Sequence, residues 1–173
     1  MVTGLLIIHQ KKKERMINTI ITVGISGSGK STWSSSFIKQ NPDYLIANRD
    51  SIRKSLVGDM TGYYQSKFLK RREEIVTELI WAYVQEICAE NFNLVFDNTN
   101  LKKEYFLPFL DKSMFNTKFK LFDVTTSLAK ERVNNRDFDG KATPEQLAYI
   151  DKHYYQYVEI KTFLMNHYKH LLL

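Results

Sequence analysis

Short apolar runs recur along the chain, and each is bounded by polar residues that are typical of turns. Four of these runs have the length and the β-branched or aromatic content of strands in a buried sheet, and they cover residues 18–23, 44–47, 93–96 and 119–122. Longer stretches, in which apolar residues have helical spacing, separate the runs. Strands that alternate with helices predict a parallel sheet, because each parallel pair needs a long crossover connection.

The longest helical pattern extends from about Gln65 to Glu90, where apolar side chains recur every three or four residues. This stripe predicts a helix that packs against the sheet as part of the core. Further helices are expected over residues 32–39, 103–112, 127–136 and 144–169, the last with Pro144 in its first turn.

The length and composition suit one globular domain over residues 16–173, because 43% of the 173 residues are apolar. Residues 1–15 form a basic extension in which Lys11 to Arg15 precede Met16, a second candidate start. Such an extension is either a solvated tail or an arm that contacts nucleic acid. We favour the tail, because charge runs at chain ends are usually solvated.

The formal net charge of +6 favours a polyanionic partner, although 25 basic against 19 acidic residues is a moderate excess. A single cysteine, Cys88, excludes an internal disulfide and is typical of a reduced structural residue. No apolar run has the length of a membrane span, and the run at residues 4–8 is too short for a signal-peptide core. We therefore expect a cytoplasmic protein without a membrane partner.

A glycine-rich segment follows the first predicted strand directly and reads Gly-Ile-Ser-Gly-Ser-Gly-Lys-Ser-Thr over residues 24–32. The spacing Gly24-x4-Gly29-Lys30-Ser31 is that of a P-loop, whose backbone N–H groups cradle phosphates. Lys30 is expected to reach the β- and γ-phosphates and Ser31 to hold Mg²⁺, while the dipole of the following helix faces the phosphates. The segment therefore predicts binding of ATP with Mg²⁺. The other residues expected to contact the nucleotide are Ser26, Gly27, Ser28 and Thr32.

After the second predicted strand the chain reads Ala-Asn-Arg-Asp-Ser-Ile-Arg over residues 47–53. The carboxyl ends of parallel strands face the ligand crevice, so Asp50 is expected near the phosphates. Asp50 and Arg53 would share one face of a helix, where the carboxylate can take a proton from a hydroxyl while the guanidinium holds an anion. The alternative is a helix cap with a surface ion pair, but the position one strand after the P-loop favours a functional pair.

Asp97 follows the third predicted strand, at the place where many P-loop proteins hold Mg²⁺ or its water. An Asx turn is an equally good interpretation of this residue. Further along, Arg132 and Arg136 are one helical turn apart, just before the polar segment 137–143. This arrangement predicts an arginine-bearing lid over the triphosphate, with Arg136 stabilising a transferring phosphate. A solvated pair at the end of a helix is the alternative.

Together these segments resemble the 5′-kinase domain of bacteriophage and bacterial polynucleotide kinases, within the wider group of P-loop phosphotransferases related to adenylate kinase. The resemblance covers nearly the whole chain from Met16. The Asn-Arg-Asp-x-x-Arg pattern is its most discriminating part. Its motifs lie at residues 24–33, 47–53, 97–101 and 122–124, followed by Arg132 and Arg136.

The resemblance implies a P-loop three-layer α/β sandwich around a four-stranded, mainly parallel sheet, with a tunnel-like acceptor site opposite ATP. It implies that Asp50 is the general base for a 5′-hydroxyl, that Arg53 holds the neighbouring phosphate, and that Arg136 stabilises the phosphate in transfer. Ser26 and Ser51 differ from the residues of the phage enzyme, which has proline and aspartate there. Neither difference removes a catalytic group.

The leading hypothesis is therefore an enzyme that transfers the ATP γ-phosphate to the 5′-hydroxyl of single-stranded or nicked DNA or RNA ends. One alternative is a small-molecule kinase acting on a nucleoside, sugar or antibiotic hydroxyl, since a P-loop and an aspartate base suffice for that reaction. Another is a nucleotide-dependent switch or toxin-like binding module. The aromatic residues Trp33, Tyr63 and Tyr64 are candidates for stacking on an acceptor base.

Overall fold

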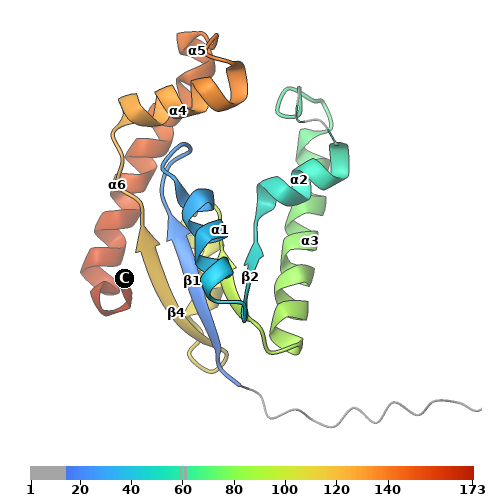
Figure 1. The fold of residues 1–173 in the computed structure, drawn as a ribbon, viewed down its shortest axis with the longest axis vertical. Coiled ribbons are helices and arrows are strands. Elements are labelled where there is room, and N and C mark those ends of the chain that lie inside the picture. The colour runs from blue at the N-terminus through green and yellow to red at the C-terminus, as the bar shows by residue number, and fades with distance from the viewer. Residues whose placement is uncertain (1–14, 59, 61) are drawn as a thin grey trace, which may run out of the picture.

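The computed structural model describes residues 15–58, 60 and 62–173 (Figure 1). One parallel sheet has the strand order β2-β3-β1-β4, formed by β1 (Ile17–Val23), β2 (Tyr44–Ala47), β3 (Asn93–Phe96) and β4 (Phe115–Leu121). The two inner strands are therefore β3 and β1, and the P-loop follows β1. This arrangement confirms the predicted α/β fold. The predicted extension over residues 1–15 lies almost entirely outside the described residues and stays a prediction.

The fourth strand begins four residues earlier than the sequence pattern predicted. Phe115, Thr117 and Phe119 are buried, while the residues between them are more exposed. Such alternation is the pattern of a strand with one face on the core, whereas the prediction relied on a continuous apolar run. The strand pairs with β1 over its whole length, from Ile17 opposite Phe115 to Val23 opposite Leu121.

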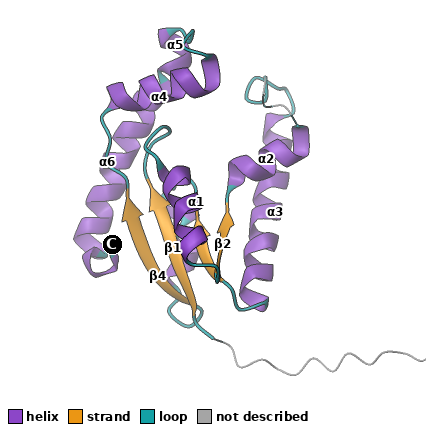
Figure 2. Cartoon of the chain, in the orientation of Figure 1, coloured by secondary structure: helices purple, strands orange, loops and turns teal. Residues whose placement is uncertain are grey.

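Helices lie on both sides of the sheet (Figures 1 and 2). The long helix α3 (Leu69–Ala89) is the predicted one, although it begins later than expected because residues 63–68 form turns. Its buried stripe, consisting of Val76, Ile80, Val84 and Ile87, confirms the core role that the spacing predicted. The helices are α1 (Lys30–Gln40), α2 (Arg49–Val57), α3 (Leu69–Ala89), α4 (Thr126–Phe138), α5 (Pro144–Leu147) and α6 (Tyr149–His167).

Two of the predicted helices were wrong in form. The segment expected as one helix over 103–112 consists of two 3₁₀ turns, η1 (Lys103–Tyr105) and η2 (Leu107–Leu110), because Pro108 lacks the N–H that an α-helix would need. The helix expected over 144–169 is divided into α5 and α6 and ends in a short 3₁₀ turn, η3 (Lys169–Leu171).

Aromatic packing joins these turns to the sheet and to α3. The ring of Trp81 stacks on Phe109 with centroids 5.3 Å apart, and Phe106 meets Phe119 edge-on at 5.3 Å. Phe106, Phe109 and Phe119 are fully buried. Because buried aromatic rings contribute strongly to core stability, this packing stabilises the sheet that carries the loops at its carboxyl edge.

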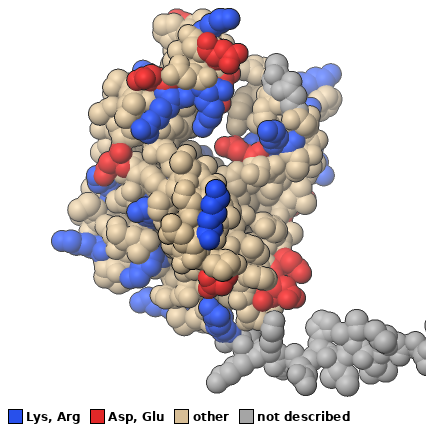
Figure 3. Space-filling view, viewed as in Figure 1, with Lys and Arg blue, Asp and Glu red and all other residues tan. Residues whose placement is uncertain are grey.

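Two arms stand above the carboxyl ends of the strands, one formed by α2 with the start of α3 and the other by α4 with α5 (Figure 1). The space-filling view shows the surface hollowed between them, with basic and acidic side chains on both walls (Figure 3). In the described ranges, no helix is long and apolar enough to cross a membrane.

Candidate active site

The segment after β1 has the backbone geometry of a phosphate cradle. Gly27 and Gly29 have φ angles of +78° and +93°, which L-residues with a side chain rarely adopt. Gly29 is the N-cap of α1, and within the described chain no side chain caps this helix. The first N–H groups of α1 therefore point into the hollow without a side-chain acceptor, an arrangement that suits a bound anion.

Lys30 lies inside this cradle and is only 8% exposed. Its Nζ donates hydrogen bonds to the carbonyl oxygen of Ile25 at 2.8 Å and to the hydroxyl of Ser28 at 3.3 Å. Burial lowers the pKa of Lys30 to about 8, while the charges of Asp97 and Asp50 oppose this shift. A phosphate bound in the cradle would place a negative charge next to the buried ammonium and would stabilise its charged form.

Asp97 is 2% exposed at the end of β3, and its carboxylate interacts with the hydroxyls of Ser31 and Thr22. Burial raises the pKa of Asp97, and the Ser31 hydroxyl and the Lys30 ammonium partly offset this effect. The structure thus brings together the two residues predicted to hold a metal ion. A hydroxyl and a carboxylate are oxygen ligands of the kind that Mg²⁺ prefers, so the donor set fits this ion. Elsewhere, the described ranges contain no cluster of three or more His, Cys, Asp or Glu residues that could hold a metal.

Asp50 and Arg53 form the predicted pair on α2. The Nη1 of Arg53 donates to the Oδ1 of Asp50 at 2.5 Å, and the Asp50 side chain is 75% exposed whereas that of Arg53 is 14% exposed. The cap of α2 is Asn48, whose side chain accepts a hydrogen bond from the Ser51 N–H at 2.8 Å. Asp50 therefore has no capping role, and its carboxylate is exposed to solvent.

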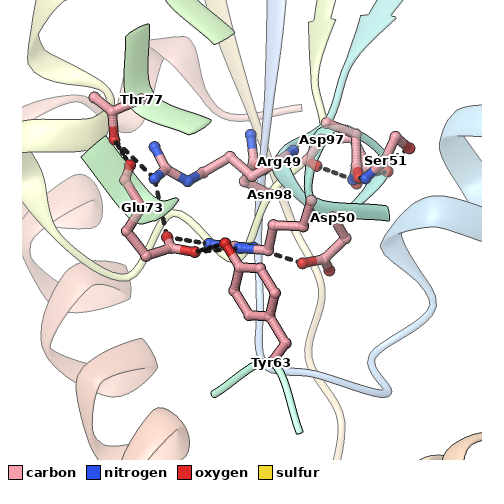
Figure 4. Close-up of polar contacts among 10 residues, drawn as sticks. Arg49, Asp50, Ser51, Tyr63, Glu73, Thr77, Asp97 and Asn98 are labelled. Carbon is pink, nitrogen blue, oxygen red and sulfur yellow. Dashed lines mark hydrogen bonds and ion pairs between the residues drawn. The ribbon is translucent and has the colours of Figure 1, made fainter. Parts of the chain in front are cut away.

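A glutamate that sequence reasoning missed holds this pair in place (Figure 4). Glu73 on α3 accepts two hydrogen bonds from Arg53, at 2.8 Å from Nε and at 2.7 Å from Nη2. It also accepts one from Arg49 at 3.2 Å and one from the Tyr63 hydroxyl at 2.9 Å. The only sequence signal was an acidic residue next to the basic stretch 67–72, twenty positions after Arg53.

The interactions in this cluster favour the ionised forms of Glu73 and Arg53. The hydrogen bonds from Arg53 lower the pKa of Glu73 to about 2, despite its partial burial. Burial alone would lower the pKa of Arg53, but the hydrogen bonds to Glu73 and the nearby carboxylates raise it above its ordinary value. Arg53 is therefore a permanent cation with a fixed orientation, and it faces the carboxylate of Asp50.

On the opposite arm, Arg132 contacts the P-loop, since its Nη1 donates to the carbonyl oxygen of Gly27 at 3.2 Å. Arg136, one turn later, is bound by the neighbouring Asp137 at 2.6 Å and 2.7 Å. The segment predicted as a lid loop over 137–143 needs correction, because α4 continues to Phe138 and the loop begins at Asp139 in the left-handed conformation. The structure therefore places one predicted arginine against the cradle and the other on the arm above it.

A substitution at Gly27 tests the backbone geometry of the cradle without changing a charged or hydroxyl side chain. A Cβ at this position would lie 2.5 Å from the carbonyl oxygen of Ala129 on α4, and the φ angle would also be strained. Gly27→Ala is expected to reduce the free energy of unfolding by about 1–3 kcal/mol and to weaken nucleotide binding at least tenfold. Gly62→Ala is the matched control, because it has a similar φ of +67° and nothing within 4 Å. Thermal unfolding and nucleotide titration would show the difference, and equal effects of both substitutions would contradict the predicted clash.

Comparison with known proteins shows the family to which this chain belongs. The family model described as AAA domain (AAA_33) matches residues 19–156. A protein of Autographa californica nuclear polyhedrosis virus, whose name describes a bifunctional polynucleotide kinase/RNA ligase, is 28% identical over 154 residues, which is 83% of this chain and 21% of that protein. The chain thus spans about a fifth of the viral relative's length.

Solved structures of other proteins are also similar to this chain. A chain in the structure of the Pnkp1/Rnl/Hen1 RNA repair complex matches with a TM-score of 0.71 and 26% identity, over 88% of this chain and 47% of that chain. Deoxyadenosine kinase from M. mycoides has a TM-score of 0.58 and 17% identity over 90% of this chain and 88% of its own, which shows a shared fold. The resemblance to polynucleotide kinases that the motifs indicated is confirmed, and the chain belongs to the AAA domain family, within the P-loop kinase fold.

Proposed function

We propose that this chain transfers the γ-phosphate of ATP to the 5′-hydroxyl end of a DNA or RNA strand. The observation that carries the proposal is the Asp50–Arg53 pair, in which the Asp50 carboxylate is exposed and close enough to the P-loop for its charge to act on Lys30, while Arg53 is fixed by Glu73. The likeness to proteins named for polynucleotide kinase activity and for an RNA repair complex supports it. Because this chain spans only part of those proteins, their other activities are not transferred to it.

On the donor side, the uncapped start of α1 and Lys30 would bind the triphosphate. Ser31 and Asp97 would hold Mg²⁺, which supplies charge neutralisation on the phosphates when it is bound. Arg136 would approach the γ-phosphate if it exchanged the Asp137 carboxylate for a phosphate oxygen. The arm formed by α4 and α5 is then the lid over the nucleotide.

On the acceptor side, the Asp50 carboxylate would accept the proton of the attacking hydroxyl. A guanidinium has five N–H donors, and Arg53 uses one donor from each of its three nitrogens on Glu73 and Asp50. Two N–H groups, one on each terminal nitrogen, are left to hold a phosphate oxygen. The pair therefore matches an acceptor that carries a hydroxyl and a nearby phosphate, as the end of a strand does.

A panel of acceptors tests this proposal directly. The protein would be incubated with Mg²⁺ and γ-labelled ATP against 5′-hydroxyl oligonucleotides of DNA and RNA, a nucleoside 3′-monophosphate and a free nucleoside. Label on the phosphate-bearing acceptors, with at least a tenfold preference over the nucleoside, is the expected result, and Arg53→Ala should abolish that preference. Arg71→Ala is the matched control, since this arginine is exposed on α3 and pairs with Glu74.

Two outcomes would contradict the proposal. Label on the nucleoside alone would identify a small-molecule kinase. Label on no acceptor, with ATP binding retained, would favour the nucleotide-dependent switch.

Glu73 is expected to act through Arg53. In Glu73→Gln the amide keeps one oxygen, which can accept at most two of the four hydrogen bonds, and its NH2 group accepts none, so Arg53 loses its fixed orientation. We expect kcat/KM for phosphate-bearing acceptors to fall about tenfold to a hundredfold, with the affinity for ATP unchanged. In the double variant with Arg53→Ala, the loss should equal that of Arg53→Ala alone. Additive losses would show that Glu73 acts by another route.

A further inference from the structure

Two large aromatic side chains are exposed on the arm that carries the proposed acceptor site. Tyr64 is 56% exposed and Phe68 is 58% exposed, in the segment that leads from α2 into α3. Tyrosine and phenylalanine each bury a large apolar area when they pack, so exposure of two rings in one short segment calls for an explanation. A ligand that covers the rings would provide one.

The position of Tyr64 is set by buried neighbours. Tyr63 is 1% exposed and is anchored by its hydroxyl on Glu73. The ring of Tyr64 meets that of Tyr63 edge-on at 5.2 Å, and it lies 6.0 Å from the guanidinium carbon of Arg53. The exposed Tyr64 ring is therefore held, through Tyr63, by Glu73, which is the same carboxylate that orients Arg53.

Positive charge accompanies the rings. Lys67 lies over the ring of Phe68, with its Nζ 5.1 Å from the centroid, and Arg72 lies 5.6 Å from the ring of Tyr63. Exposed aromatic rings interleaved with lysine and arginine are the composition of surfaces that bind single-stranded nucleic acid, since the rings stack on bases and the cations contact phosphates. These side chains extend from Tyr64, which lies next to Arg53. Their chemistry therefore fits a nucleic-acid strand as the ligand.

The other aromatic candidates from the sequence do not offer such a surface. Tyr63 is buried. Trp33 stacks on Phe37 with centroids 4.9 Å apart on α1, and the Nζ of Lys120 lies 5.1 Å from its ring. The three-dimensional arrangement thus selects Tyr64 from the three residues.

We propose that Tyr64, with Phe68 and Lys67, forms a stacking subsite for the second nucleotide of a single-stranded acceptor. This inference rests on the proposed function. The phosphate held by Arg53 would join the first nucleotide to the second, so a ring 6.0 Å from the guanidinium is within reach of the second base. The acceptor class is therefore a strand of at least two nucleotides with an unpaired end, and a mononucleotide would leave the subsite empty.

The test compares acceptors that differ only in length: a nucleoside 3′-monophosphate, a dinucleotide and a hexanucleotide. Wild type is expected to prefer the two longer acceptors. Tyr64→Ala should lower kcat/KM for them about tenfold and leave the value for the monophosphate unchanged, because only the longer acceptors have a second base that stacks on the ring. Tyr64→Trp should keep the preference, since it retains a flat ring. Tyr155→Ala is the matched control, because Tyr155 is 71% exposed on α6.

The results separate this inference from the function on which it rests. Equal kcat/KM values for all lengths in wild type would overturn the subsite while leaving the kinase function intact. Equal losses for the monophosphate and the hexanucleotide in Tyr64→Ala would also overturn it, since they would place Tyr64 against the first nucleotide or in the fold. Absence of label on every acceptor would instead refute the kinase function itself.

Discussion

Replacing Asp50 by asparagine is expected to lower kcat for phosphate transfer about a thousandfold, with little change in ATP affinity. The substitution removes the proposed proton acceptor, and general base catalysis is typically worth about 10²–10⁴ in rate. The amide oxygen of the introduced asparagine can still accept the hydrogen bond from Arg53, so the pair keeps its geometry. Since the Asp50 side chain is 75% exposed, the fold should not be affected.

Single-turnover kinetics and an ATP titration would measure the two quantities separately. Asp50→Glu is a useful companion, because it keeps the carboxylate and displaces it by one methylene, and we expect intermediate activity. A loss of less than about tenfold in Asp50→Asn would show that the hydroxyl proton is taken by another group. Weaker ATP binding without a change in kcat would assign Asp50 to the donor side.

Replacing Lys30 by methionine is expected to lower kcat about a hundredfold to a thousandfold and to weaken ATP binding. Methionine fills similar space but supplies no charge to a transferring phosphate. Burial of the Lys30 ammonium carries a desolvation penalty, which lowers its pKa to about 8 against an ordinary value of 10.5. The ammonium is therefore destabilising to the fold below pH 8, and this cost is relieved as the pH rises towards 10.5. We thus expect Lys30→Met to unfold at no lower a temperature than wild type at about pH 7.

The same pKa makes a prediction for the pH dependence of binding. Phosphates favour the charged form of Lys30, so nucleotide binding above pH 8 must take up a proton that the free protein has lost. The affinity of wild type should fall between about pH 8 and about pH 10, and that of Lys30→Met should be nearly constant over the same range. Calorimetry in buffers of different ionisation enthalpy would detect the proton uptake. A wild-type affinity that does not change over this range would contradict the buried position of the ammonium.

Several parts of the site were open to prediction because their geometry is local. The cradle over residues 24–32 depends on glycines that adopt positive φ and on a helix that starts at Lys30, and both follow from adjacent residues. The Asp50–Arg53 pair depends on a spacing of three within one helix. The apolar stripe of α3 and three of the four strands were predicted for the same reason, since their periodicity is contained in short windows.

Prediction was wrong where one residue overrides a pattern or where a pattern alternates. Pro108 removes a backbone donor, so the apolar segment around it forms 3₁₀ turns instead of one helix. The first half of β4 alternates buried and exposed residues and was missed for lack of a continuous apolar run. The start of the predicted lid loop was misplaced by two residues, because Asp139 rather than Asp137 leaves the helical conformation.

The fold class, the glycine-rich cradle and the Asp50–Arg53 ion pair could be predicted from the chain alone, because each depends on residues that are close along it. The way in which that pair is held became visible in three dimensions, because Glu73 reaches Arg53 from another helix. The tertiary structure also decided that Tyr63 is buried and Tyr64 exposed, although the two residues are adjacent and chemically identical. Spacing cannot predict such choices, since they depend on which face of a loop the packing of α2 against α3 covers.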